Sequence, residues 1–139
     1  MTIRVLIVDD SSVIRRSLRV FIERNTEWQV CGEAENGKIA VQKVQELHPH
    51  LVILDLSMPV MNGLEAARQI TRIAPTVAMV MFTMHVNPQL RSDAQAVGIQ
   101  DVVSKSEGIE DHLLPSMRTI GAALQKQDHT VSLAKFPRA

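Results

Sequence analysis

Residues 3–10 read IRVLIVDD and residues 51–55 read LVILD, so two short apolar runs each end in aspartate. Continuous runs of β-branched residues and leucine at this length predict strands that are buried on both faces of a sheet. Three further strands are predicted at residues 28–33, 77–82 and 101–104. The intervening segments carry apolar residues at helical spacing. Five strands that alternate with five helices predict an α/β fold, a five-stranded parallel sheet with helices on both faces.

The length and charge of the chain limit its functional class. Its 139 residues fit one domain, and fifteen basic side chains balance fifteen acidic ones, so the formal net charge is zero. This balance gives no electrostatic reason for the domain to contact nucleic acid or a membrane. A single cysteine, Cys31, excludes an internal disulfide and is typical of a reducing compartment. With neither a signal segment nor a membrane span in the sequence, we expect a cytoplasmic protein.

The expected domain covers residues 1–125, where the strand and helix patterns are found. Residues 126–139 show no sustained period, which predicts a tail or the remnant of a linker.

Polar side chains stand at the expected carboxyl ends of four strands. Asp9 and Asp10 follow the first run and Asp55 follows the third. Thr83 follows the fourth run and Lys105 follows the fifth. Open parallel sheets bind ligands beyond these ends, so we expect the five side chains to converge. Three crowded carboxylates repel one another, and Mg²⁺, which prefers oxygen ligands, is the simplest ion to neutralise them.

A carboxylate can also accept a phosphoryl group as an aspartyl phosphate, and Asp55, in the centre of the sheet, is the best candidate for this nucleophile. Asp9 and Asp10 would then hold the metal, while Lys105 and Thr83 would contact the phosphoryl oxygens. Any one of these residues alone is better explained as a helix cap, a strand end or a solvated charge. Their joint occurrence at four strand ends favours the functional interpretation.

The order and spacing of these motifs resemble the receiver domains of two-component response regulators over about the first 125 residues. The segments that carry the resemblance are residues 5–11, 54–59, 61–63, 82–85 and 104–105. The run 55–66 is similar to receivers that precede a helix-turn-helix DNA-binding domain of the quorum-response and nitrate-response type. The resemblance implies a flavodoxin-like, doubly wound (βα)5 fold.

The resemblance also implies a mechanism. Asp55 would be phosphorylated by a sensor histidine kinase, and Asp10 and Asp55 would ligate Mg²⁺ directly. Asp9 would act on the ion largely through water, and the backbone carbonyl of Ser57 would be a further ligand. Slow self-catalysed dephosphorylation is implied as well, with Ser57 and His85 near the path of the attacking water.

The sequence departs from the family pattern at four positions. Val102 stands where many receivers have an aromatic switch residue, and the bulky Met84 follows the switch threonine. Ser106 follows the lysine, and Pro115 falls in the first turns of the last helix, whose start it should shift or bend.

Several functions remain open from the sequence. The output is expected to be transcription, acting on DNA only through an output domain that this sequence does not contain; a stand-alone receiver and an unphosphorylated adaptor are the alternatives. The chain could form a homodimer through its first and last helices or through its fourth and fifth. A magnesium-dependent phosphatase of the haloacid-dehalogenase type is disfavoured, because its second acid would fall at Ser57.

Overall fold

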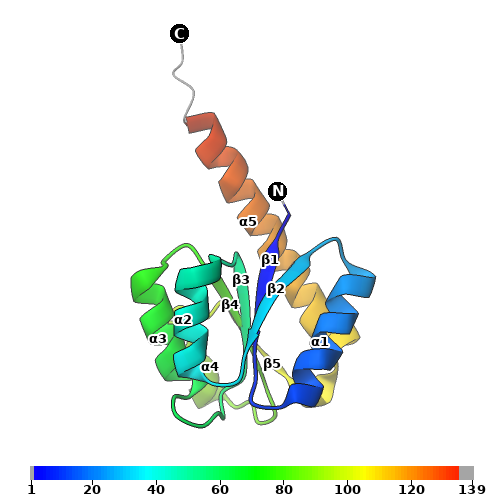
Figure 1. Ribbon diagram of the computed structural model, residues 1–139, viewed down its shortest axis with the longest axis vertical. Helices are drawn as coiled ribbons and strands as arrows, with labels where there is room; N and C mark the ends of the chain where they lie inside the picture. The colour runs from blue at the N-terminus through cyan, green and yellow to red at the C-terminus, as the bar shows by residue number, and fades with distance from the viewer. Residues whose placement is uncertain (1, 135–139) are drawn as a thin grey trace.

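A computed structural model describes residues 2–134 of the chain, with the side chains of residues 2–127. One parallel sheet forms its centre, with strand order β2-β1-β3-β4-β5 (Figure 1). The strands are β1 (Arg4–Val8), β2 (Gln29–Ala34), β3 (Leu51–Leu54), β4 (Ala78–Thr83) and β5 (Asp101–Ser104). This arrangement confirms the predicted α/β fold with a doubly wound, five-stranded parallel sheet.

Helices cover both faces of the sheet. They are α1 (Ser12–Asn25), α2 (Gly37–Leu47), α3 (Gly63–Ile73), α4 (Pro88–Ala96) and α5 (Leu114–Ala134). α1 and α5 pack on one face, and α2, α3 and α4 pack on the other (Figure 1). Successive side chains of a strand point to opposite faces, so a strand between two helical layers needs apolar residues throughout.

The first strand shows this requirement directly. Val5 and Ile7 belong to the core under α1 and α5, whereas Leu6 and Val8 belong to the core under the other three helices. All four side chains are at most 1% exposed. Both faces of β1 are therefore filled from Val5 to Val8, and the first exposed residue after the strand is Asp10.

Polar caps fix where four of the helices start. The N-cap residues are Ser11, Asn36, Asn62 and Asn87. The side-chain oxygen of each accepts a hydrogen bond from a backbone N–H three residues later. Such bonds satisfy amide groups that the first helical turn leaves free. The loops at the carboxyl edge of the sheet are thus held at the ends where the helices begin.

Gly63 brings the start of α3 against the end of β3. Its N–H donates to the carbonyl of Leu56 at 2.9 Å. A Cβ atom at this position would lie 2.1 Å from the carbonyl oxygen of Asp55. Only glycine permits this approach, which packs the helix against the backbone that carries Asp55.

The last helix is longer than predicted. It continues past residue 125, where we expected the domain to end, and reaches Ala134. The expected tail from residue 126 is therefore helical as far as Ala134, and residues 135–139 lie outside the described part. No glycine or proline falls between residues 122 and 134 to stop the helix. Although α5 has 21 residues, no helix within residues 2–134 is both long and apolar enough to cross a bilayer.

The start of α5 is irregular, as Pro115 predicts. A π-helical turn, Ile109–Leu113, precedes the helix, and the N–H of Leu114 donates to the carbonyl of Ile109. Pro115 has no N–H to continue a regular ladder. The connection from β5 to α5 thus contains a widened turn close to Lys105.

Candidate functional site

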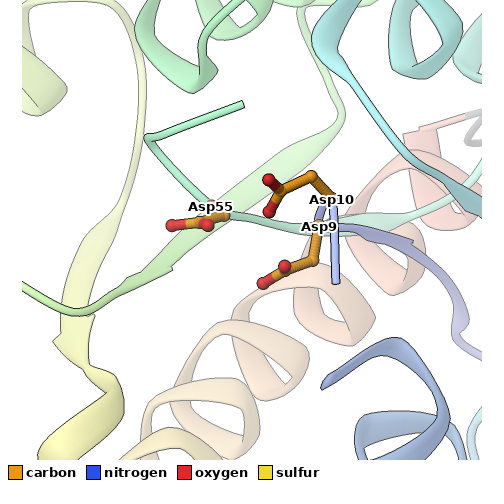
Figure 2. A group of neighbouring side chains, drawn as sticks. All are labelled: Asp9, Asp10 and Asp55. Carbon is orange, nitrogen blue, oxygen red and sulfur yellow. The ribbon is translucent and has the colours of Figure 1, made fainter. Parts of the chain in front are cut away.

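Three carboxylates meet at the carboxyl edge of the sheet. Asp9 and Asp10 follow β1 and Asp55 follows β3, and their side chains lie together in Figure 2. One oxygen from each lies within 4.8 Å of the others. Asp9 is 2% exposed and Asp55 is 6% exposed, whereas Asp10 faces solvent. The structure therefore brings together the three acids that the sequence predicted at this edge.

The ammonium group of Lys105 lies between two of the acids. Its Nζ is 2.8 Å from Oδ2 of Asp9 and 3.2 Å from Oδ2 of Asp55. Lys105 directly follows β5, so the contact spans from the edge of the sheet to its middle. When all three acids are ionised, one ammonium leaves two negative charges uncompensated, which is the charge that a divalent cation supplies.

Backbone amides hold the remaining oxygens of the two buried acids. Oδ1 of Asp9 accepts the N–H of Ser11 at 2.9 Å, and Oδ1 of Asp55 accepts the N–H of Leu56 at 2.8 Å. In each carboxylate, one oxygen thus accepts a backbone N–H and the other contacts Nζ of Lys105. The two carboxylates are fixed in orientation before any ligand arrives.

Burial raises the pKa of Asp9 above its ordinary value. The hydrogen bonds from Lys105 and from the N–H of Ser11 oppose this rise, and the charge of Asp55 adds to it. Burial also acts to lower the pKa of Lys105, but the hydrogen bonds and charges of Asp9 and Asp55 outweigh it, so that this pKa is raised. Lys105 is therefore a cation at neutral pH, and the ionised form of Asp9 is disfavoured where it stands.

Thr83 ends β4 next to the cluster and is 3% exposed. In the sheet register it is the partner of Ser104, the residue before Lys105. The hydroxyl of Ser104 also donates to the carbonyl of Met84 at 3.5 Å, which links β5 to the loop after β4. Both Met84 and His85 are exposed in that loop.

Ser57 is exposed in the loop between β3 and α3, two residues beyond Asp55. Its expected role as a carbonyl ligand stays a prediction, as does its place with His85 near an attacking water.

One residue that contacts the site was missed in the sequence. Nη1 of Arg15, in the first turn of α1, donates to the backbone carbonyl of Asp9 at 2.6 Å. Nε of the same side chain donates to Glu33 of β2 at 3.0 Å. Arg15 is only five residues after Asp10, which could have suggested a contact with the site. Its contact with Glu33 on β2 could not be predicted from spacing along the chain.

The acid cluster fits a magnesium ion. Mg²⁺ binds oxygen ligands at about 2.0–2.1 Å, so ligands on opposite sides of the ion lie roughly 4.2 Å apart. The spread of up to 4.8 Å among the three carboxylate oxygens is close to this size. Asp9, Asp10 and Asp55 are also oxygen donors only, which suits this ion and disfavours softer metals.

The fold and the site together define a class: a doubly wound parallel α/β domain with an acid cluster and a lysine at the carboxyl edge of its sheet. The family model for the response regulator receiver domain matches residues 5–132. The chain therefore belongs to the response regulator receiver family.

Solved structures and curated relatives agree with this assignment. The response regulator domain of CheB from Thermotoga maritima is 31% identical, with a TM-score of 0.79, over 90% of this chain and 98% of that one. A two-component response regulator of the LuxR family from Aurantimonas sp. SI85-9A1 is 30% identical, with a TM-score of 0.83, over 88% of this chain and 87% of that one.

Curated relatives that match the chain include longer proteins with different outputs. The transcriptional regulatory protein YdfI of Bacillus subtilis is 46% identical over 80 residues, which are 58% of this chain and 38% of that protein. A protein-glutamate methylesterase/protein-glutamine glutaminase of Geobacillus kaustophilus is 36% identical over 140 residues, 99% of this chain and 40% of that protein. The chain thus spans about two fifths of the length of these relatives, and the likeness to methylesterases was not foreseen in the sequence.

Replacing Asp9 with asparagine should change how stability depends on pH in the metal-free protein. Because the folded pKa of Asp9 lies above 3.8, the folded protein binds this proton more tightly than the unfolded chain does. The resulting stabilisation is fully present below the unfolded pKa and is lost as pH rises through the folded pKa. Asp9→Asn has no such proton to lose, so its free energy of unfolding should rise relative to wild type as pH increases above about 4, the ordinary pKa of an aspartate.

Urea unfolding followed by circular dichroism in a chelator measures this difference at each pH. Asp111→Asn, which removes an exposed aspartate outside the cluster, is the control. If the free energy of unfolding of Asp9→Asn relative to wild type stays constant, or falls, as pH rises, the raised pKa of Asp9 is contradicted.

Proposed function

We propose that this chain is a phosphoacceptor receiver, phosphorylated on Asp55 by a sensor histidine kinase. The observation that carries the proposal is the position of Asp55. It directly follows β3, the central strand of the sheet, has one oxygen 3.2 Å from Nζ of Lys105, and lies within the acid cluster. A carboxylate in this place is ready to act as a nucleophile, with positive charge beside it for the incoming oxygens.

In the transfer, a carboxylate oxygen of Asp55 forms a bond to phosphorus while the bond from phosphorus to the donor's histidine nitrogen breaks. The imidazole keeps the electron pair of the broken bond and takes up a proton from solvent. Lys105 turns from Asp55 toward the phosphoryl oxygens, and the hydroxyl of Thr83 donates to one of them. Bound Mg²⁺ would supply charge neutralisation for the transferred group. Asp9, Asp10, Asp55 and the carbonyl of Ser57 would hold it.

The new phosphoryl group carries about 1.5 to 2 negative charges next to the end of β4 and replaces the single charge of the Asp55 carboxylate. Thr83 and Lys105 are drawn toward it, and the loop that carries Met84 follows, because Ser104 is bonded to its backbone. Val102 is 5% exposed and cannot supply the aromatic rotamer change of other receivers. Shifting such a switch from mostly off to mostly on takes roughly 5 kcal/mol of differential stabilisation, and several charge-assisted bonds can provide this.

The output of the switch lies in another domain or partner. Transcription is favoured by the 46% identity to YdfI and by the LuxR-family structure. A methylesterase output is the second candidate, favoured by relatives that align with nearly the whole chain. A cytoplasmic location and a homodimer stay predictions.

Asp55→Asn should abolish phosphorylation. Wild-type protein incubated with Mg²⁺ and a small acyl phosphate should gain one phosphoryl group in intact-mass spectrometry, because the carboxylate is the nucleophile. The variant should gain none, and Asp93→Asn, on the exposed face of α4, should behave as wild type. A phosphoryl group that persists in Asp55→Asn, or wild type that gains none, refutes the proposed function.

Thr83→Ala should uncouple phosphorylation from the movement of α4. In ¹H–¹⁵N spectra, the phosphorylated wild type should show shifted amides in the loop after β4 and in α4. These shifts should be smaller in the variant at equal phosphorylation, because the variant lacks the hydroxyl that would move toward the phosphoryl group and donate to it. Thr119→Ala removes an exposed hydroxyl of α5 and is the control. Undiminished shifts in Thr83→Ala would count against this switch.

A further inference from the structure

The backbone N–H and the backbone carbonyl of Asp9 are both held by hydrogen bonds that connect them to β2, one directly and one through Arg15. Its N–H donates to the carbonyl of Ala34 at 3.0 Å. Its carbonyl accepts Nη1 of Arg15 at 2.6 Å, and Nε of Arg15 donates to Glu33 at 3.0 Å. Ala34 therefore holds the amide directly, and Glu33 holds the carbonyl through Arg15.

The sheet register explains why Glu33 can do this. Glu33 pairs with Ile7, whose side chain belongs to the core under α1 and α5, so Glu33 points to the same face. Arg15 and Arg19 lie one turn apart on α1, and both reach this carboxylate. Only Arg15 also donates to Asp9, and its side chain is 17% exposed against 35% for Arg19.

The carbonyl in question belongs to the peptide that joins Asp9 to Asp10. A peptide is planar, so its orientation is set by the ψ angle of Asp9 and the φ angle of Asp10. A bond to that carbonyl limits both angles, and with them the directions of two carboxylates of the cluster. The bond comes from a charged donor, which makes it stronger than a neutral one.

The charge of Glu33 completes the arrangement. A bare guanidinium beside the acid cluster would repel an incoming cation. Glu33 lies against this guanidinium and compensates part of its charge, so Arg15 can orient the peptide with less repulsion of a cation than a bare guanidinium would cause.

We propose that Arg15, held by Glu33, is a positioning residue that sets the affinity of the acid cluster for a divalent cation. The inference rests on the proposed function, in which Asp9, Asp10 and Asp55 hold Mg²⁺. The ordinary alternative is that the ion pair only fastens α1 to β2. In that case its loss would lower stability and leave cation binding unchanged.

The test is calorimetric titration of the full chain with Mg²⁺. Arg15→Gln should raise the dissociation constant about tenfold or more, the size of effect seen when a residue that orients metal ligands is lost. Glu33→Gln should raise it in the same direction. Arg15→Lys can reach one partner but not both, and should fall between. Arg19→Gln, which shares Glu33 but does not donate to Asp9, should stay close to the wild-type value.

Circular dichroism and urea unfolding report whether each variant is folded; if Arg15→Gln is not, Arg15→Lys decides. Wild-type affinity in the folded Arg15 variant, or an equal loss in Arg19→Gln, overturns the proposal. So does wild-type protein that does not bind Mg²⁺.

Phosphorylation by an acyl phosphate at saturating Mg²⁺ is measured separately. Arg15-dependent Mg²⁺ binding without phosphorylation of wild type would refute the proposed function and leave the positioning role intact. Phosphorylation of Asp55 with Mg²⁺ affinity independent of Arg15 would refute the positioning role alone.

Discussion

Repulsion among Asp9, Asp10 and Asp55 is the constraint on which the rest of the structure depends. One oxygen from each lies within 4.8 Å of the others, and two of the three side chains are almost completely buried. Lys105 compensates only part of their charge. A cluster of this kind costs free energy, and it keeps its geometry only if rigid surroundings hold it. The filled cores on both faces of the sheet provide that rigidity, and the remaining charge creates the affinity for a cation.

The same edge of the sheet connects the cluster to the surface. Thr83 is the last residue of β4 and Lys105 directly follows the adjacent strand β5. The hydroxyl of Ser104 donates to the loop that leads into α4. A change of charge at Asp55 is therefore next to groups that can move, while the strands beneath them cannot. This combination of a rigid sheet and adjustable loops is what a switch requires. Val102 is not aromatic, so the proposed coupling runs through the loop after β4 and its hydrogen bonds.

Much of this architecture could be predicted from the sequence because it depends on local patterns. Apolar runs located the five strands, and strand ends located the acids, since parallel strands finish at one edge. The length of α5 was missed, because its last turns lack the apolar periodicity that marked the other helices. The contact of Arg15 with Asp9 and Glu33 was also missed. It depends on which face of β2 Glu33 occupies, and this follows from register rather than from spacing along the chain.

The position of a bound metal ion is the most direct test of the acid cluster. Crystals grown with Mn²⁺, a divalent ion that also takes oxygen ligands, would locate the ion by anomalous scattering. We predict one strong peak within bonding distance of carboxylate oxygens of Asp10 and Asp55. A peak elsewhere, or none at this edge of the sheet, would contradict this prediction.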